Sequence, residues 1–388
     1  MADSQANTHR ETREWLLLVE CASARPDPAK FLTLERACRF EHLLQLAEAH
    51  GVIHLLASRL READGISAPR EFRQRLLELE RAQLLSGLAL IAEMIRVLER
   101  FAAAGIQTLV LKGPALSLQA YGDATARQFA DIDLLVRHGD VLRATKVMME
   151  AGFAPAVGPE VVAAGKVPGE YSFSRPGSTV IVEVHTERTL RYFPNRLAVE
   201  EVFLRSARLD FDGRAVPALS LEDALVSMCT HGAKHFWERL MWIADVAATL
   251  ARRPEVDWEA ARTIAKKLDA QRMLHSGLLL ARDLLKAPLP AGVERDARAD
   301  RGARALARKI QNWLPAAEGT SAGLVGRALF RAQMRSGFWA GIGYLTRLSL
   351  SPTEDDWEQG QEHKPSRYRD MSRRLWRLLG KYGRDPNQ

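Results

Sequence analysis

The sequence predicts an α+β protein in which a small α/β unit is flanked by helical regions on both sides. Apolar residues recur at helical spacing in the first hundred residues, short β-branched and aliphatic runs follow, and helical spacing then returns. We therefore expect an N-terminal helical region over residues 1–104, an α/β core over 105–216, and a C-terminal helical domain over 217–388 that ends in a basic tail.

The composition is that of an ordinary globular protein, with 47% apolar and 27% charged residues among 388. No apolar run approaches the roughly 20 residues that a membrane span requires, and the N-terminus has no secretory signal pattern, so we expect a cytoplasmic protein without a membrane partner. Three widely spaced cysteines, Cys21, Cys38 and Cys229, predict neither disulfides nor a zinc site.

The N-terminal region is expected to hold two long helices. Leu, Ile and Ala recur at three- and four-residue steps over residues 31–60 and again over 71–101. Gly65 and Pro69 separate the two segments, and Gly105 is suited to end the second.

The α/β core is expected to contain strands, two short helices and a hairpin. A glycine followed by proline predicts the start of the first helix, and Arg175-Pro-Gly-Ser178 predicts the hairpin turn. In chain order the expected elements are a strand at 108–111, a helix at 114–118, a strand at 132–136, a helix at 141–149, and hairpin strands at 171–174 and 179–187.

Beyond Pro217 the pattern is helical, beginning at a capped start formed by Ser220 and Asp223. The expected helices cover residues 231–250, 258–268, 272–285, 304–313 and a basic segment at 366–382. The net charge of +7 owes much to this tail. A basic run is more often a solvated helix face than a nucleic-acid site, and no nucleic-acid motif accompanies it.

Asp131 and Asp133 are the first candidates for catalysis. The period of two along a strand places both carboxylates on one face, opposite Ile132 and Leu134. An ionised carboxylate within an apolar strand is costly unless a cation or hydrogen bonds compensate it, so the pair favours a metal site over incidental strand-end acids.

Glu183 and His185 share one face of the expected hairpin strand. Glu183 is the natural third acid, either as a metal ligand or as the base that accepts a proton. The alternative is that this face is simply the solvated side of the hairpin.

Lys112 and Gly113 precede the helix at Pro114, where glycine permits close approach of a phosphate and free N–H groups attract the anion. The turn is not a Walker A loop. Lys112 would contact a phosphate or pair with Asp131, and Arg127 would contact a phosphate or form a surface ion pair.

His231 and His235 lie four residues apart on an expected helix, but no glutamate follows His231 and no third ligand is evident, which argues against a zinc protease. Lys234 would reach a triphosphate if this helix covers the active face. The alternative is that these polar residues only stabilise a domain interface.

Four segments of the sequence together resemble the uncharacterised bacterial nucleotidyltransferase family of the DNA polymerase beta-like superfamily. These segments are Leu111-Lys-Gly-Pro-Ala-Leu116, Asp131-Ile-Asp133 with Arg127, Glu183-Val-His185 and His231–Trp237. The resemblance covers roughly residues 30 to 250. It implies a mixed-sheet nucleotidyltransferase core with two Mg²⁺ ions, or Mn²⁺, bound by Asp131, Asp133 and Glu183.

Three features depart from the superfamily pattern. Gly113 precedes proline where serine or glycine is usual, the third acid is glutamate where aspartate is more frequent, and the gap between Gly113 and Asp131 is longer. Metal binding is therefore better supported than the triphosphate contacts.

The resulting hypothesis is a nucleotidyltransferase that moves a nucleoside monophosphate from a nucleoside triphosphate to a hydroxyl or phosphate acceptor and releases pyrophosphate. Lys112, Gly113, Arg127, Lys234 and His185 would bind the nucleotide. A small molecule or peptide is a better candidate acceptor than a nucleic acid. Two alternatives stay open, namely an inactive nucleotide- or partner-binding module and an RNA-directed enzyme whose tail guides the acceptor. The sequence selects neither the base of the nucleotide, ATP included, nor the oligomeric state.

Overall fold

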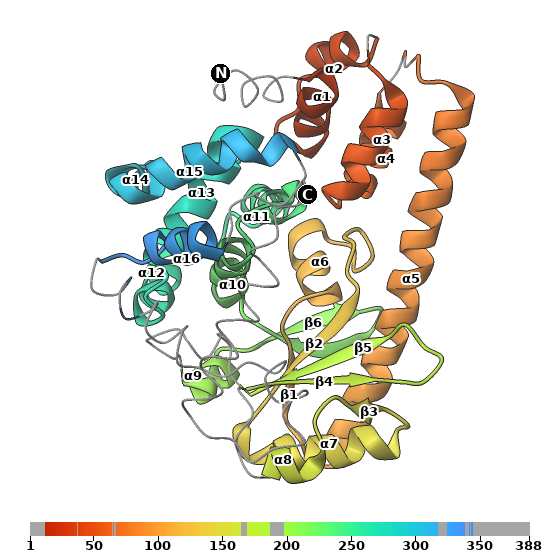
Figure 1. Ribbon diagram of the computed structural model, residues 1–388, viewed down its shortest axis with the longest axis vertical. Helices are drawn as coiled ribbons and strands as arrows, with labels where there is room; N and C mark the ends of the chain where they lie inside the picture. The colour runs from red at the N-terminus through yellow and green to blue at the C-terminus, as the bar shows by residue number, and fades with distance from the viewer. Residues whose placement is uncertain are drawn as a thin grey trace.

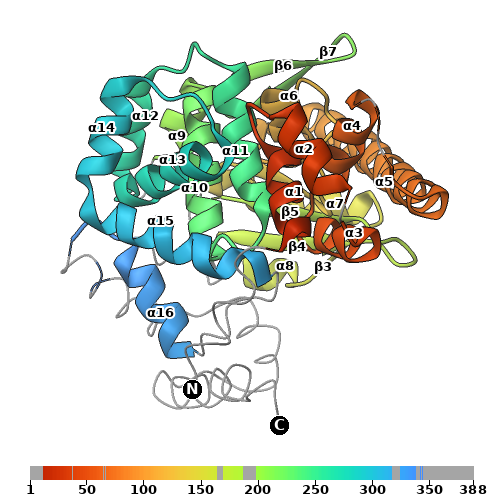
Figure 2. The same cartoon turned by 90° about the horizontal axis from the view of Figure 1, so that it is seen from above.

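The computed structural model describes residues 12–36, 38–63, 65, 67–163, 169–186, 198–316, 324–337, 341 and 343. One mixed sheet and a large helical layer make up the described part of the chain, which confirms the α+β prediction. Figure 1 shows most of the helices gathered above the sheet, with α5 (Arg70–Ala103) running along one side of both layers. Figure 2, seen from above, shows the N-terminal helices beside the C-terminal ones.

The sheet has seven strands in the order β3-β4-β5-β2-β1-β7-β6. Strand β2 pairs antiparallel with β1 and parallel with β5, so the sheet is mixed. The strands are β1 (Thr108–Val110), β2 (Asp131–Val136), β3 (Ala154–Pro155), β4 (Glu170–Ser174), β5 (Ile181–His185), β6 (Ala207–Phe211) and β7 (Arg214–Ala218).

Alternation along β2 divides its side chains between two hydrophobic cores. Ile132, Leu134 and Val136 are at most 1% exposed and belong to the core that the sheet forms with α5 and α7 (Val141–Glu150). Leu135 points the other way and joins the core of the helical layer. Asp131 and Asp133 share the face of Leu135, and the sheet therefore presents them toward the helical layer.

The helical layer combines segments from both ends of the chain. Its N-terminal members are α1 (Arg13–Ala22), α2 (Pro28–Glu35), α3 (Phe40–Ala49) and α4 (Ile53–Glu62). Its C-terminal members are α10 (Leu221–Lys234), α11 (Leu240–Arg252), α12 (Trp258–Lys267), α13 (Gln271–Leu285), α14 (Ala291–Ala299), α15 (Arg301–Trp313) and α16 (Leu324–Gln333). The shorter helices α6 (Pro114–Tyr121), α8 (Pro159–Ala163) and α9 (Val199–Leu204) connect strands.

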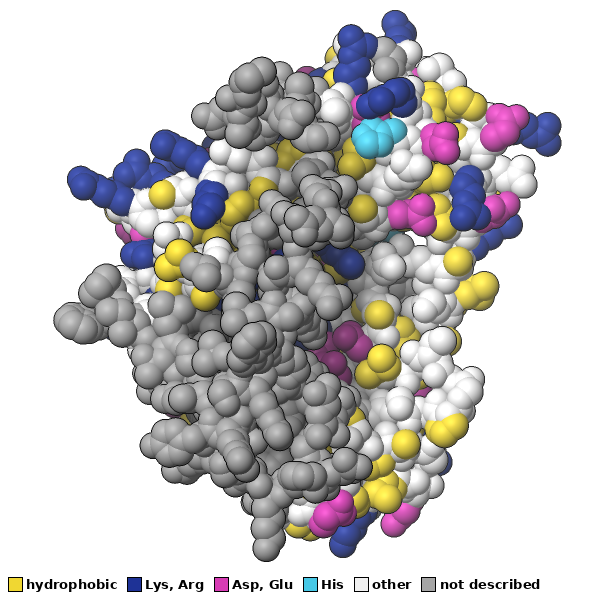
Figure 3. Space-filling view, in the orientation of Figure 1, with side chains coloured by type: hydrophobic (Ala, Val, Ile, Leu, Met, Phe, Trp, Pro, Cys, Tyr) yellow, Lys and Arg dark blue, Asp and Glu magenta, His cyan; other side chains and the backbone are white. Residues whose placement is uncertain are grey.

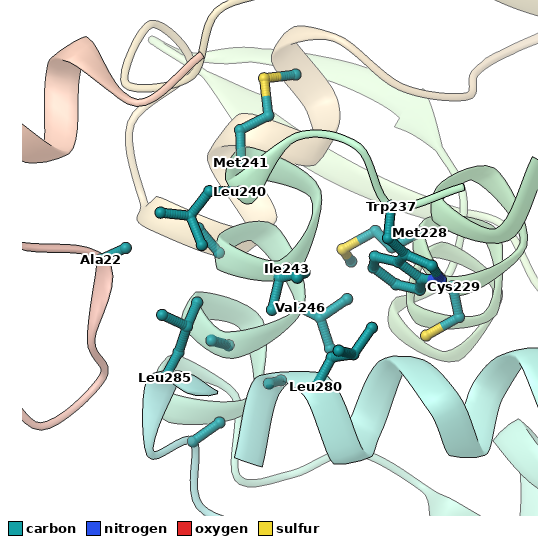
Figure 4. Packing of buried hydrophobic residues seen from close by; sticks show 14 of the residues in the cluster. Ala22, Met228, Cys229, Trp237, Leu240, Met241, Ile243, Val246, Leu280 and Leu285 are labelled. Atoms are coloured by element: carbon teal, nitrogen blue, oxygen red, sulfur yellow. The ribbon is translucent and has the colours of Figure 1, made fainter. Parts of the chain in front are cut away.

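Trp237 is the central side chain of the helical core. It is fully buried, and Figure 4 shows it among Met228, Cys229, Val246 and Leu280. Two helical glycines make room for the indole, because a Cβ added at Gly232 or at Gly277 would lie 2.6 Å or 3.0 Å from its ring atoms. Helix α10 therefore packs against α13 through a close contact that larger residues would prevent.

Three sequence predictions of the fold need correction. The single helix expected over residues 31–60 is three helices, with breaks around residues 36–39 and at Gly51, which has a positive φ of 68°. The helix expected over 231–250 stops at Lys234 and resumes at Leu240, because Phe236 and Trp237 both adopt left-handed backbone conformations. The β6–β7 hairpin was not predicted.

Other predictions agree with the structure. Strands β4 and β5 form the expected antiparallel hairpin, and α5 covers the expected segment, with α6 beginning at Pro114. The basic helix expected at 366–382 lies outside the described residues. None of the described helices is both long and apolar enough to cross a membrane. The division into three domains stays a prediction.

Replacement of Trp237 by alanine is expected to lower the free energy of unfolding by about 3–5 kcal/mol, because the two glycines leave a cavity that no neighbour fills. Denaturant unfolding measures this loss. Trp258→Ala is the control, since Trp258 is only partly buried and its loss should cost clearly less. Equal losses in the two variants would show that Trp237 has no special packing role.

Candidate active site

Four polar side chains converge on the face of the sheet that looks toward the helical layer. Asp131 and Asp133 come from β2, and Glu183 and His185 come from β5. In the parallel register Asp133 lies opposite Glu183, which places both side chains on the same face. Figure 3 shows acidic side chains in a hollow near the middle of the molecule.

Asp133 is the centre of this group. Its side chain is 1% exposed, and its Oδ1 accepts hydrogen bonds from Lys112 Nζ at 2.8 Å and from His185 Nε2 at 3.0 Å. The same His185 nitrogen lies 3.5 Å from Glu183 Oε2. A carboxylate so deeply buried is stable only with such partners.

The pKa values follow from these contacts. Burial would raise the pKa of Asp133, but Lys112 and then His185 outweigh it and hold the pKa far below its usual range. Burial likewise opposes protonation of His185, yet hydrogen bonds to Asp133 and Glu183 raise its pKa to about 9. At neutral pH His185 is therefore an imidazolium that donates to carboxylates.

Asp131 has the opposite character. Burial, followed by repulsion from Asp133, raises its pKa to about 6, and the attraction of Lys112 only partly offsets the shift. Asp131 is the carboxylate of the site whose ionised form lacks compensation, and an added cation would stabilise it.

The turn between β1 and α6 positions Lys112. Leu111 N donates to the carbonyl of Asp133 at 3.0 Å, which fixes the chain beside β2 just before Lys112. Gly113 has φ 58° and ψ −126°, a conformation that favours glycine, and Pro114 then starts α6. The structure thus pairs Lys112 with Asp133, whereas Asp131 was the expected alternative partner.

Arg127 is held in a buried ion pair. Its Nε donates to Asp245 Oδ2 at 2.7 Å, both side chains are at most 6% exposed, and the Tyr121 hydroxyl donates to the other Asp245 oxygen at 2.9 Å. The expected alternatives were a phosphate contact or a surface ion pair. Because the guanidinium is committed to α11, we interpret Arg127 as a residue that fixes the loop before β2.

The C-terminal end of α10 lies near the carboxylates. Lys234 is partly buried, and the described residues place no hydrogen-bond or ion-pair partner on its amino group. Burial lowers its pKa, against the attraction of Glu170, while Lys112 adds repulsion. Within the described part of the chain, Lys234 is therefore an uncommitted cation that lies close enough to Glu170, Glu183 and Asp133 to interact with their charges.

His231 and His235 pack against each other and against Trp242, with ring centroids 4.6 to 5.6 Å apart. Burial, and then the charge of Lys112, lowers the pKa of His231 well below its usual value. Among the described residues, these rings belong to no cluster of metal-ligating groups.

Sequence reasoning missed the contribution of β4 to this face. Glu170 lies opposite His185 and Ser172 opposite Glu183 in the antiparallel register. The signal was available, because Tyr171 and Phe173 are the buried residues of an alternating strand and leave Glu170 and Ser172 on the other side.

A metal ion fits part of this arrangement. One ligand atom from each of Asp133, Glu183 and His185 lies within 4.8 Å of the others. Asp131 is a further carboxylate on the same strand face. The carboxylates of Asp131, Asp133 and Glu183 offer oxygen ligands, which divalent cations such as Mg²⁺ and Mn²⁺ prefer.

Comparison with protein families finds a match to a family described as uncharacterised nucleotidyltransferase, over residues 37–286. This segment contains every residue of the site described above. The comparison with curated proteins finds no match.

Among solved structures, the chain is similar to the antibiotic-resistance factor ANT(2'')-Ia, with 13% identity over 56% of this chain and 94% of that chain and a TM-score of 0.29. It is also similar to an antigenic nucleotidyltransferase-like protein from Paracoccidioides brasiliensis, with 15% identity over 54% of this chain and 94% of that chain and a TM-score of 0.30.

Asp131→Asn is expected to stabilise the metal-free protein at pH 8 by on the order of 1–2 kcal/mol, after allowance for partial exposure. The pKa of Asp131 is raised to about 6 in the fold from an ordinary 3.8. Ionisation of Asp131 therefore costs stability above pH 6, and the penalty disappears as pH falls below 4.

Thermal melts of the wild type and the variant between pH 4 and pH 8 measure this difference. Wild-type protein should gain stability on addition of Mg²⁺ or Mn²⁺, and the variant should gain less. A variant that is less stable than the wild type at pH 8 in the absence of metal would contradict the electrostatic account of Asp131.

Proposed function

The chain belongs to this family of uncharacterised nucleotidyltransferases. We propose that it is a divalent-metal-dependent enzyme that transfers a nucleoside monophosphate from a nucleoside triphosphate to a hydroxyl or phosphate acceptor. The observation that carries the proposal is the convergence of Asp131, Asp133 and Glu183 on one face, with Asp133 held between Lys112 and His185.

Asp131, Asp133 and Glu183 would hold the metal. The raised pKa of Asp131 supports this, because a cation at this point offsets both the loss of solvation on burial and the repulsion from Asp133. When bound, Mg²⁺ or Mn²⁺ supplies positive charge that neutralises phosphate oxygens and lowers the pKa of the acceptor hydroxyl.

The residues of the chain divide the remaining work. Lys112 keeps Asp133 ionised and fixed in place through the 2.8 Å contact. His185 donates to the carboxylate of Asp133 and lies close to that of Glu183, so it positions both. We assign His185 a positioning role, because its Nε2 contacts the carboxylates of both Asp133 and Glu183.

The transfer itself forms one P–O bond and breaks another. The acceptor oxygen attacks the α-phosphorus, its proton passes to a carboxylate oxygen of Glu183, and the bond between the α-phosphorus and the bridging oxygen breaks. Pyrophosphate leaves with the electrons of that bond. We assign the proton to Glu183 because its carboxylate is only partly buried and is not ion-paired with Lys112, whereas Asp133 is both buried and ion-paired.

The nucleotide phosphates would meet positive charge on the opposite side of the site. Lys234 has no described partner and faces the carboxylates from α10. Lys112 and the backbone at Gly113 border the same space from the β1–α6 turn. A cation without a partner beside a carboxylate group is suited to a ligand that carries both phosphate and metal.

Asp133→Asn is expected to lower pyrophosphate release by at least ~100-fold, because it removes a metal-binding charge while the side chain keeps its shape. The assay supplies all four nucleoside triphosphates with Mg²⁺ and a panel of hydroxyl compounds, with water as the default acceptor. Glu150→Gln is the control, since Glu150 is exposed at the end of α7, away from the acids.

Circular dichroism should show that both variants fold. Turnover by Asp133→Asn at the rate of the control would sink the assignment of the active site.

A further inference from the structure

Helix α16 lies beyond the residues 37–286 that match the family, yet it returns to the end of α10. Arg331 Nη2 donates to the carbonyl oxygen of Lys234 at 3.1 Å. The guanidinium also lies 4.9 Å from the centroid of the Phe236 ring. These contacts fix an arginine directly beside the uncommitted Lys234.

Part of this guanidinium has no partner. Arg331 Nε is buried and makes no hydrogen bond within the described part of the chain. A buried N–H of a charged group costs free energy when it is left unsatisfied, so such a group is a candidate for an anionic ligand.

Arg327 is the natural comparison, because it lies one turn earlier on α16 and 5.0 Å from the same Phe236 ring. Its Nη2 lies 3.7 Å from Glu238 Oε1, so its charge has a partner within the protein. The two arginines therefore share a helix and a ring contact but differ in whether a carboxylate compensates them.

Several cations lie close to His235. His235 lies among Lys234, Lys112 and Arg331, whose positive charges follow burial as causes of its lowered pKa. Lys112 contacts Asp133, and Arg331 contacts the backbone of Lys234. No described carboxylate forms an ion pair with Lys234 or Arg331.

We propose that Arg331, together with Lys234, binds the outer phosphates of the nucleoside triphosphate. The inference rests on the proposed function, which places the α-phosphorus beside the carboxylates. The β- and γ-phosphates would then extend toward Lys234 and Arg331. A guanidinium presents several N–H groups in one plane, which match the oxygens of a phosphate. The contact with the carbonyl oxygen of Lys234 uses only one nitrogen of Arg331.

Isothermal titration with inorganic pyrophosphate in metal-free buffer tests the site, because pyrophosphate carries the same phosphate chemistry and needs neither metal nor acceptor. Wild-type protein should bind it, and Arg331→Gln should bind at least tenfold more weakly. Arg327→Gln should stay within twofold of the wild type, since Arg327 is compensated by Glu238.

The proposal is overturned if Arg331→Gln binds pyrophosphate as tightly as Arg327→Gln does. It is also overturned if the wild type fails to bind pyrophosphate. If Arg331→Gln does not fold, as judged by circular dichroism, Arg331→Lys replaces it and should still weaken binding by at least threefold; unchanged binding by that variant overturns the proposal. A protein that binds pyrophosphate through Arg331 but transfers no nucleotide would refute the proposed function and leave this site intact.

Discussion

The buried carboxylate of Asp133 is the constraint on which the site depends. Its position in the middle of the sheet is tolerable only because Lys112 and His185 both donate to it. Each partner comes from a different element, the β1–α6 turn and strand β5, so the three must be assembled by the sheet. The same contacts keep His185 protonated and leave Asp131 as the acid that lacks compensation.

The helical layer supplies the opposite charge. The left-handed turn at Phe236 and Trp237 ends α10 just after Lys234, and the burial of Trp237 between Gly232 and Gly277 fixes that end. Carboxylates on the sheet thus face cations on the helices. This separation of charge is suited to a metal-bound polyanion, because the carboxylates would bind the metal and the cations would bind the anionic groups.

Much of this could be predicted from the sequence, because alternation within a strand is a local property. The pattern around Asp131 and Asp133 was enough to place both on one face, and alternation along β5 was enough to place Glu183 and His185 on one face. The parallel pairing of β5 with β2, which brings Glu183 opposite Asp133, is a contact between strands that are distant in the sequence. Tertiary contacts were not predictable in the same way. The partner of Arg127 is Asp245, 118 residues away, and Arg331 reaches Lys234 from a helix with no distinguishing motif. The break after Lys234 goes together with the packing of Trp237 against Gly232 and Gly277, a tertiary contact that local propensity does not encode.

Binding of Mn²⁺, followed by electron paramagnetic resonance, tests most directly whether these carboxylates form a metal centre. The wild type should bind Mn²⁺, more tightly when a nucleoside triphosphate is present, and Glu183→Gln should bind at least about tenfold more weakly, in line with the loss of a charged ligand. Equal Mn²⁺ affinity in the wild type and Glu183→Gln, with no effect of nucleotide on either, would contradict the account.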